Sequence, residues 1–255
     1  MFSNYHTHSL FCDGADSPEE LVQEAIRLGC PEIGFSGHSH LAEDVGSMSE
    51  EGTREYCAEV RRLQKQYEGR IRILLGIEQD IFSEIERPLF DYVIGAVHYV
   101  EKNGVKYAVD ESRENFLAAA EDVYGGDYLA MAEDYYALVG ALPEKTGCDI
   151  VAHFDLITKY NEGDALFSTA DPRYIAAADA ALERLLEAGP RPLLEVNTGA
   201  MARGWRSEAF PERRIRERWL GEGGKLILAS DCHDRRNLLY AFDEFAALPH
   251  VTTLC

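Results

Sequence analysis

The chain has 255 residues, and its 45 acidic side chains outnumber its 25 basic ones to give a formal net charge of −20. This balance argues against a nucleic-acid partner, because binding to a phosphate backbone needs a concentrated basic surface. No apolar run reaches the roughly 18 residues of a membrane span, and neither a leader-like N-terminus nor a C-x-x-C pair is seen, so we expect a cytoplasmic protein with reduced thiols and no membrane partner.

Short apolar runs alternate with helical stretches along the chain. In order, we expect a strand at 2–6, a helix at 17–28, a strand at 32–36, a helix at 49–67, strands at 71–77 and 92–97, a hairpin around 103–104, a helix at 115–139, a strand at 149–152, a helix at 171–187, a strand at 193–196, a helix from 211, a strand at 225–229 and a helix at 237–247. The first helix is well marked, because Ser17 and Glu20 form a capping box and Pro18 takes the first helical position.

Apolar runs such as VIGAV and LILAS are typical of parallel strands that are buried on both faces. Alternation with helices allows either a closed barrel or an open doubly wound sheet. An open sheet builds its site mainly from strands beside one switch point, whereas a barrel brings all its strand ends to one ring. Polar side chains follow six of the seven expected strands. We therefore predict an α/β barrel that forms a single domain over residues 1–255.

Seven of the eight histidines lie at the downstream ends of these runs. They are His6, His8, His38, His40, His98, His153 and His233, and the carboxylates of Glu78 and Asp231 occupy equivalent places. One such histidine alone is usually an ordinary core or surface residue, but independent placement would put only about one or two there. Imidazole and carboxylate ligands suit zinc, iron or manganese better than calcium or magnesium. The pattern predicts a metal site.

The motifs around these residues resemble those of the PHP (polymerase and histidinol phosphatase) superfamily. The likeness rests on His6-Thr7-His8, GFSGH ending at His38, GIEQD carrying Glu78, AVH of His98, AHFD of His153 and SDCH of Asp231 and His233. It covers essentially the whole chain. EVNTGAMARGWR and HFDLITKY are most similar to the monofunctional histidinol-phosphate phosphatases of histidine biosynthesis. The resemblance implies a distorted, TIM-like (β/α)7 barrel that binds three divalent metal ions, zinc, manganese or iron.

The resemblance also implies a set of metal ligands. One metal would be held by His6, His8, Glu78 and Asp231, a second by Glu78, His98 and His153, and a third by Asp13, His38 and His233. Some relatives carry histidine where this chain has Asp13, which leaves the metal preference of the third site open. Glu78, Asp231 and His233 would also serve catalysis, in which a hydroxide that bridges two metals attacks phosphorus.

Substrate contacts are expected from loops beyond the metal ligands. The resembling phosphatases bind phosphate with arginine and tyrosine from the loops that here carry Arg203, Lys159 and Tyr160. Lysine at 159 lacks the bidentate fork of arginine. His40 either contacts the substrate or supports the site. Candidates to meet the ammonium and imidazole of the substrate are the carboxylates of Asp80, Asp155 and Glu162.

The resemblance implies hydrolysis of a small phosphomonoester, L-histidinol phosphate, to L-histidinol and phosphate, by a monomer or homodimer. Two alternatives remain open: another phosphoesterase of the superfamily, acting on phosphotyrosine proteins or nucleotides, and a metal-binding protein without turnover. The chain has no G-x-S-x-G, H-E-x-x-H or P-loop motif. Long loops after the fifth and sixth expected strands favour a lidded pocket for a small molecule over the open site that a protein substrate needs.

Overall fold

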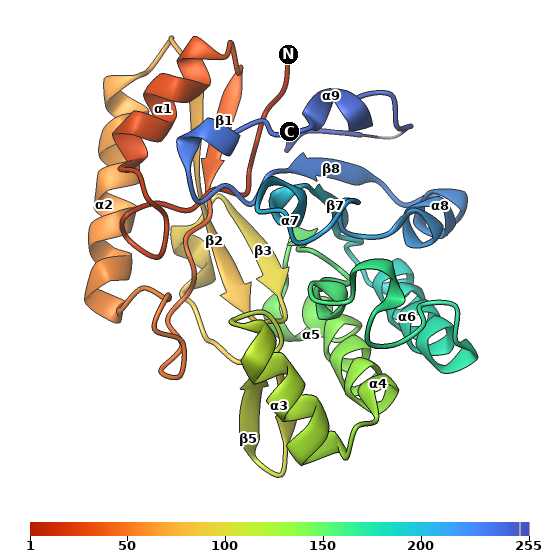
Figure 1. Ribbon diagram of the computed structural model, residues 1–255. Coiled ribbons are helices and arrows are strands. Elements are labelled where there is room, and N and C mark those ends of the chain that lie inside the picture. Colours follow the sequence, from red (N-terminus) through yellow and green to blue (C-terminus); the bar gives the residue numbers. More distant parts are fainter. Residues whose placement is uncertain (250, 255) are drawn as a thin grey trace.

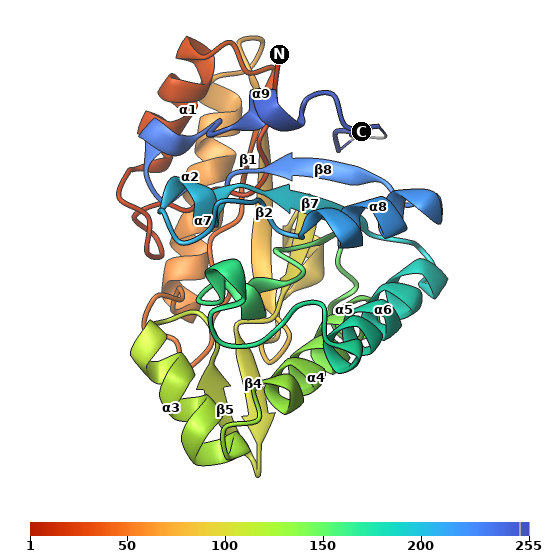
Figure 2. The ribbon, with the colours of Figure 1, turned by 45° about the vertical axis from the view of Figure 1, so that its right-hand side comes forward.

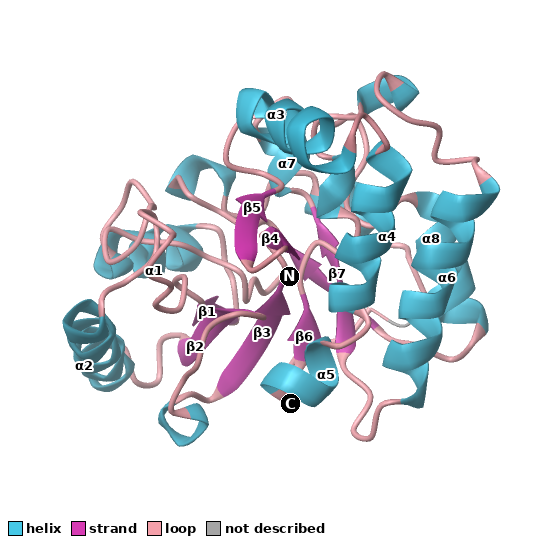
Figure 3. Ribbon diagram, turned by 90° about the horizontal axis from the view of Figure 1, so that it is seen from below, coloured by secondary structure: helices cyan, strands magenta, loops and turns pink. Residues whose placement is uncertain are grey.

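A computed structural model of the protein describes residues 1–249 and 251–254. Its main sheet has six parallel strands in the order β1-β2-β3-β6-β7-β8. Their bounds are β1 (Glu32–Phe35), β2 (Arg72–Asp80), β3 (Tyr92–Ala96), β6 (Ile150–Val151), β7 (Leu193–Asn197) and β8 (Leu226–Ala229). The strands lie in the middle of the molecule and the helices lie around them (Figure 3).

The N-terminal segment connects the two edges of this sheet. Asn4 forms an isolated parallel bridge with Ile33 of β1, and Thr7 forms another with Cys232, just after β8. Because its backbone pairing is divided between two neighbours, the segment predicted as the first strand is extended chain with isolated bridges instead of a regular strand. The predicted α/β barrel is confirmed in this form, as a curled six-stranded sheet completed by an extended segment (Figure 1).

Most helices match the predicted ones in place. The bounds are α1 (Pro18–Arg27), α2 (Glu50–Gln66), α3 (Arg113–Tyr124), α4 (Tyr128–Val139), α5 (Leu142–Thr146), α6 (Pro172–Glu187), α7 (Gly199–Ala202), α8 (Arg213–Gly221) and α9 (Phe242–Phe245). The capping box before α1 is present, since Ser17 and Glu20 each accept a hydrogen bond from the backbone N–H of the other. No helix in the described part of the chain is long and apolar enough to cross a membrane.

Two helix predictions were wrong in length. The stretch at 115–139 forms two helices, α3 and α4, because Gly125 and Gly126 adopt left-handed backbone angles (φ 63° and 82°) that end the first. The stretch at 237–247 contains only the short α9, since Ala241 before it also has a positive φ of 57°. The short helices α5 and α7 were not predicted, because four or five residues show no helical period.

A β-hairpin lies outside the barrel, formed by β4 (Tyr99–Lys102) and β5 (Val105–Ala108), and it packs against α3 (Figure 2). Its turn, at Asn103 and Gly104, has positive φ at both positions, as the Asn-Gly pair predicts. After β5, the backbone N–H of Val109 donates to the carbonyl of His98 with an N···O distance of 2.8 Å. The hairpin therefore returns the chain to the end of β3.

The core has two parts that follow from the alternation of side chains along each strand. One face of the sheet packs against the helices in a large hydrophobic cluster. A smaller cluster contains Tyr5, Leu74, Tyr92, Ile94, Ile150 and Ile227. In β2, Leu74 shares its face with Glu78. This apolar cluster therefore lies beneath the polar side chains at the strand ends. The five cysteines that the structure describes are free, and Cys255 lies outside the described residues.

Candidate metal centre

Glu78, in β2, lies at the centre of a cluster of histidines and is only 1% exposed. Its Oε2 atom is 3.2 Å from His6 Nε2, 3.4 Å from His8 Nε2 and 3.0 Å from His38 Nδ1. Its Oε1 atom is 3.0 Å from His153 Nε2 and 3.3 Å from His98 Nε2. One carboxylate therefore contacts histidines from five separate positions in the chain.

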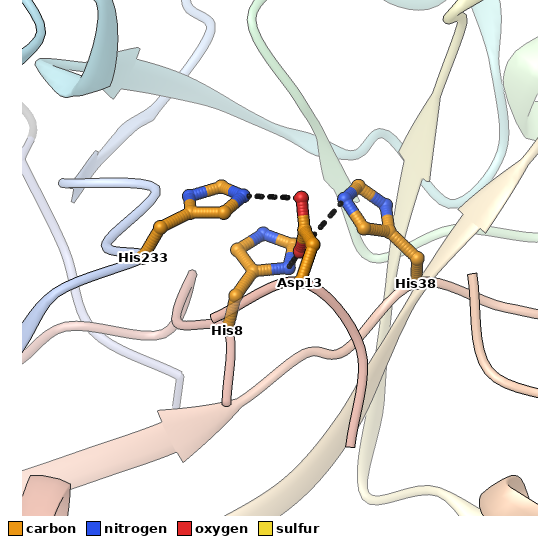
Figure 4. Close-up of side chains that lie close together, drawn as sticks. All are labelled: His8, Asp13, His38 and His233. Carbon is orange, nitrogen blue, oxygen red and sulfur yellow. Dashed lines mark hydrogen bonds and ion pairs between the residues drawn. The ribbon is translucent and has the colours of Figure 1, made fainter. Parts of the chain in front are cut away.

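Potential ligand atoms gather in three overlapping groups, each with its atoms within 4.8 Å of one another. The groups are His8, Asp13, His38 and His233; His6, His8 and Asp231; and His38, Glu78 and His98. In the first group the Asp13 carboxylate lies among the three imidazoles, with Oδ2 3.1 Å from His233 Nε2 (Figure 4). The chain thus offers three places at which side chains converge from several loops.

Unpaired buried atoms indicate that cations fit this cluster. His6 Nε2, His8 Nε2 and Glu78 Oε2 are buried without a hydrogen-bond partner, and such atoms each cost about 1–3 kcal/mol. Two ligand atoms at about 2.1 Å from one ion lie about 3.0–3.4 Å apart. The nitrogen-to-oxygen distances from Glu78 Oε2 have this spacing. The donor set of imidazoles and carboxylates suits zinc, manganese or iron.

The structure brings together all nine of the residues expected as ligands, namely His6, His8, Asp13, His38, Glu78, His98, His153, Asp231 and His233. The grouping differs from the expected one, since Glu78 is not grouped with His6, His8 and Asp231. His8 also joins the group around Asp13, and His38 joins Glu78 and His98. His153 contacts Glu78 through Nε2 but falls outside the three groups.

The carboxylates of the cluster are ionised, whereas its histidines differ in protonation. Burial opposes ionisation of Glu78, but His6, His38 and His98 hold its pKa well below the usual value. Burial likewise opposes ionisation of Asp231, yet Arg203 and His6 keep its pKa well below the usual value. Burial, with the nearby histidines His233 and His38, lowers the pKa of His8 to about 3. The two carboxylates and the neutral His8 are therefore in the forms that coordinate metals. Burial opposes protonation of His6, His38 and His98, but Glu195 raises the pKa of His6 and Glu78 raises the pKa of the other two, so these rings would lose a proton when a metal binds.

Two buried carboxylates orient histidines of the cluster by contacting the ring nitrogen that faces away from Glu78. Glu195, in β7, lies with Oε1 2.7 Å from His6 Nδ1, which directs the Nε2 atom of His6 toward Glu78. Asp80 accepts a hydrogen bond from the backbone N–H of His98 at 3.0 Å and lies 3.2 Å from its Nδ1 atom. Sequence reasoning missed the role of Glu195. The available signal was a lone carboxylate within the otherwise apolar strand LLEVN.

Arg203, which directly follows α7, reaches the edge of the cluster. Its Nη2 atom donates to Asp231 Oδ2 at 3.0 Å, and its Nη1 atom lies 3.0 Å from His233 Nδ1. Asp231 has a positive φ of 48°, an uncommon angle for a residue with a side chain. Gly199 leaves room for Arg203 to contact Asp231, because a Cβ atom at position 199 would lie 2.9 Å from Asp231 Cβ and 3.0 Å from the Arg203 guanidinium.

A cavity of about 420 Å³ opens over the cluster. Its lining includes seven of the expected ligands, and Arg203 and Lys159 add positive charge. Four carboxylates and one phenol complete much of the wall: Glu43, Asp44, Asp110, Glu111 and Tyr99. Both cationic side chains that were expected to bind substrate therefore face the same space as the candidate metal centre.

Other residues expected at the substrate do not line this cavity. His40 is exposed, with Nδ1 3.0 Å from the carbonyl of Met48. Tyr160 is buried, and its hydroxyl donates to the carbonyl of Asp110 at 2.7 Å. Both side chains lie outside the cavity wall.

The carboxylates expected at the mouth are also absent from the cavity lining, because each has another partner. Asp80 is buried behind His98, Asp155 accepts a hydrogen bond from the backbone of Glu212, and Glu162 pairs with Arg206. The acidic wall comes instead from the loop after β1 and the segment after β5, which the expected strand ends did not indicate.

Comparisons with known proteins agree with this geometry. A sequence profile of the PHP domain family matches residues 4–199. The probable histidinol-phosphatase of Deinococcus radiodurans is 29% identical to this chain over 253 residues, which cover 93% of the chain and 88% of that protein. The similarity therefore extends over nearly the whole of both proteins.

Solved structures share the fold. A provisionally named histidinol phosphatase of Listeria monocytogenes superposes with a TM-score of 0.81 at 20% identity, covering 95% of this chain and 99% of that one. The histidinol phosphate phosphatase of Lactococcus lactis, solved with zinc, L-histidinol and phosphate, superposes with a TM-score of 0.67 at 22% identity, covering 99% and 96%.

Proposed function

Since the chain belongs to the PHP domain family, we propose that it hydrolyses L-histidinol phosphate to L-histidinol and inorganic phosphate. The observation that carries this proposal is one cavity in which the histidine and carboxylate cluster, Arg203 and an acidic wall face one another. The name of the Deinococcus radiodurans relative supports the choice of substrate. Because the site draws on residues from His6 to His233, residues 1–255 would act as one phosphoesterase domain.

The site is proposed to hold three divalent metal ions, zinc, manganese or iron. The three groups of ligand atoms around Asp13, Asp231 and Glu78 support this number, and the zinc in the Lactococcus lactis structure supports the class of ion. When bound, such ions supply a hydroxide nucleophile at neutral pH and offset the negative charge of a phosphoryl group.

The protein's own side chains would position the substrate. Arg203 directs its guanidinium into the cavity beside Asp231 and His233, where it would bind the phosphoryl oxygens with charge-assisted hydrogen bonds. Lys159 would add a second positive charge from the loop after β6. Glu78, Asp231 and His233 line the same cavity and are the groups proposed to contact the reacting phosphate and its ions.

The size and charge of the cavity favour this substrate over the alternatives. A volume of about 420 Å³ suits a small molecule. The four carboxylates of the wall would repel the additional phosphates of a nucleotide, whereas they would attract a leaving group that carries an ammonium. The Arg203 side chain in the cavity is a feature that a metal-storage site without turnover does not need.

Phosphate release measured with three substrates tests the proposal. We expect metal-loaded protein to hydrolyse L-histidinol phosphate with a much higher kcat/KM than p-nitrophenyl phosphate or a phosphotyrosine peptide. A preference for the phosphopeptide would show instead a protein phosphatase. Absence of turnover on all three substrates, with metal content verified, would favour a binding protein.

A further inference from the structure

Asp110 is a carboxylate of the cavity wall that takes no part in the proposed phosphoryl chemistry. It follows the β4–β5 hairpin, whose return to the end of β3 is fixed by the hydrogen bond from Val109 N to His98 O. The backbone carbonyl of Asp110 accepts hydrogen bonds from Lys159 Nζ at 2.6 Å and from the Tyr160 hydroxyl at 2.7 Å. Side chains from the loop after β6 therefore hold this residue in place.

The Asp110 side chain faces the histidine cluster from the wall of the cavity. Lys159, His98 and His153 lower the pKa of its carboxyl group against the opposing effect of burial, so the group is ionised. Among the described residues its one ion pair is with Lys159, with Nζ 3.5 Å from Oδ2. A negative charge at this position can therefore accept a further cation.

The other three carboxylates of the wall already have closer partners. Glu43 forms an ion pair with Lys106 at 2.7 Å, Glu111 accepts a hydrogen bond from the side chain of Asn115 at 2.8 Å, and Asp44 accepts one from the backbone of Gly46 at 2.8 Å. Asp110 is also the one whose backbone is held by the loop that carries Lys159. It is thus the best positioned of the four to bind a group of the substrate.

The same cavity shows independently that it is built for a ligand. Glu78 lines it, is 1% exposed, and has an Oε2 atom without a hydrogen-bond partner. Arg203 and the cluster, where a phosphate would bind, line the same cavity as Asp110 and Tyr99. A substrate with a phosphate at one end and a cation a few bonds away would match both parts.

We propose that Asp110 is a specificity-determining residue that binds the primary ammonium group of the substrate. The inference rests on the proposed function and deepens it, because it assigns the amine of an amino-alcohol phosphate to one carboxylate. The contact between Asp110 and the ammonium is made in the ground state and the transition state alike, so Asp110 selects the substrate without taking part in the phosphoryl chemistry.

The test compares two substrates and three forms of the metal-loaded protein. The substrates are L-histidinol phosphate and its deamino analogue, an imidazolylpropyl phosphate that lacks only the amine. The proteins are wild type, Asp110→Asn, and Asp122→Asn as a matched control, since Asp122 is exposed on α3. The readouts are kcat/KM for each substrate, metal content, and inhibition by inorganic phosphate.

We expect Asp110→Asn to lower kcat/KM for L-histidinol phosphate by about tenfold to a hundredfold, mainly through KM, as for loss of a hydrogen bond to a charged group. The value for the deamino analogue, the metal content and the inhibition by phosphate should stay within about twofold. Asp122→Asn should match wild type throughout.

Two results would overturn the inference in distinguishable ways. If wild type hydrolyses L-histidinol phosphate and Asp110→Asn leaves the ratio of the two substrates unchanged, Asp110 does not bind the amine, whereas the proposed function stands. If wild type hydrolyses p-nitrophenyl phosphate but not L-histidinol phosphate, the proposed function fails together with the inference.

Discussion

The Nδ1 atom of His6 lies 2.7 Å from the Oε1 atom of Glu195, and both side chains are buried inside the barrel. The contact fixes the ring so that Nε2 points to Glu78, 3.2 Å away. The second carboxylate oxygen of Glu195 accepts a hydrogen bond from the side chain of Asn197 at 3.0 Å. The candidate metal centre therefore depends on a carboxylate that is not itself one of the grouped ligands.

Replacing Glu195 tests this dependence. Glu195→Gln keeps the shape but removes the charge that orients His6, and we expect metal affinity to fall by about 10- to 100-fold. Activity should recover in excess metal, because the ligands themselves remain. Metal titration followed by phosphate release measures both effects. Glu187→Gln, at an exposed position on α6, is the matched control. Equal metal affinity in both variants would show that Glu195 has only a packing role.

Glu78 is expected to be irreplaceable. Its two oxygens face five histidines, so Glu78→Gln removes a ligand and the charge that balances them. We expect loss of bound metal and a rate reduction of at least about a thousandfold. Elemental analysis and kcat are the measurements. A variant with full metal content and near-normal turnover would contradict the central place given to Glu78.

Arg203 should contribute to phosphate binding. With metal saturating, Arg203→Ala is expected to lower kcat/KM by about 2–4 kcal/mol and to weaken inhibition by inorganic phosphate. Because Arg203 also donates to Asp231, metal content must be measured alongside. Arg203→Lys keeps the charge but not the paired contacts, and should recover only part of the loss. Unchanged kinetics and unchanged phosphate inhibition in Arg203→Ala would remove this residue from the site.

Gly199 should not tolerate a larger side chain. A Cβ atom would lie 2.9 Å from both Asp231 Cβ and the carbonyl of Ser230, so Gly199→Ala must displace Asp231. We expect a lower Tm, a loss of about 1–3 kcal/mol in the free energy of unfolding, and reduced activity. In Gly221→Ala the new Cβ meets nothing within 4 Å, so the stability of that control should not fall. Equal behaviour of the two variants would count against a tight fit at Gly199.

The expected ligands could be identified from the sequence because parallel strands deliver their C-terminal ends to one face. His6, His38, His98 and His153 all follow apolar runs, and the structure brings them to Glu78. Glu195 could not be assigned, since its position within a strand does not reveal which side of the barrel it faces. The sequence also did not reveal that Val109, next to Asp110, pairs with His98, because the length of a hairpin says little about where its end packs.

The first expected strand is not a regular strand, for a related physical reason. Residues near Asn4 have the composition of a strand, but their hydrogen bonds are shared between β1 and the segment after β8. Local pattern does not show how pairing is divided between two neighbours. Gly125 and Gly126, by contrast, are a pair that the sequence alone indicates as a helix end, and the prediction of one long helix was wrong because it continued the helix through them.

Removal and restoration of metal test the central claim most directly. The protein is stripped with chelator, its metal content is verified by elemental analysis, and phosphate release from L-histidinol phosphate is measured before and after addition of zinc, manganese or iron. We expect no turnover in the stripped protein and recovery with at least one of these ions, because the ions supply the hydroxide nucleophile. The buried atoms of His6, His8 and Glu78 that have no hydrogen-bond partner are the ones expected to bind them. Full activity of protein verified as metal-free would contradict the account.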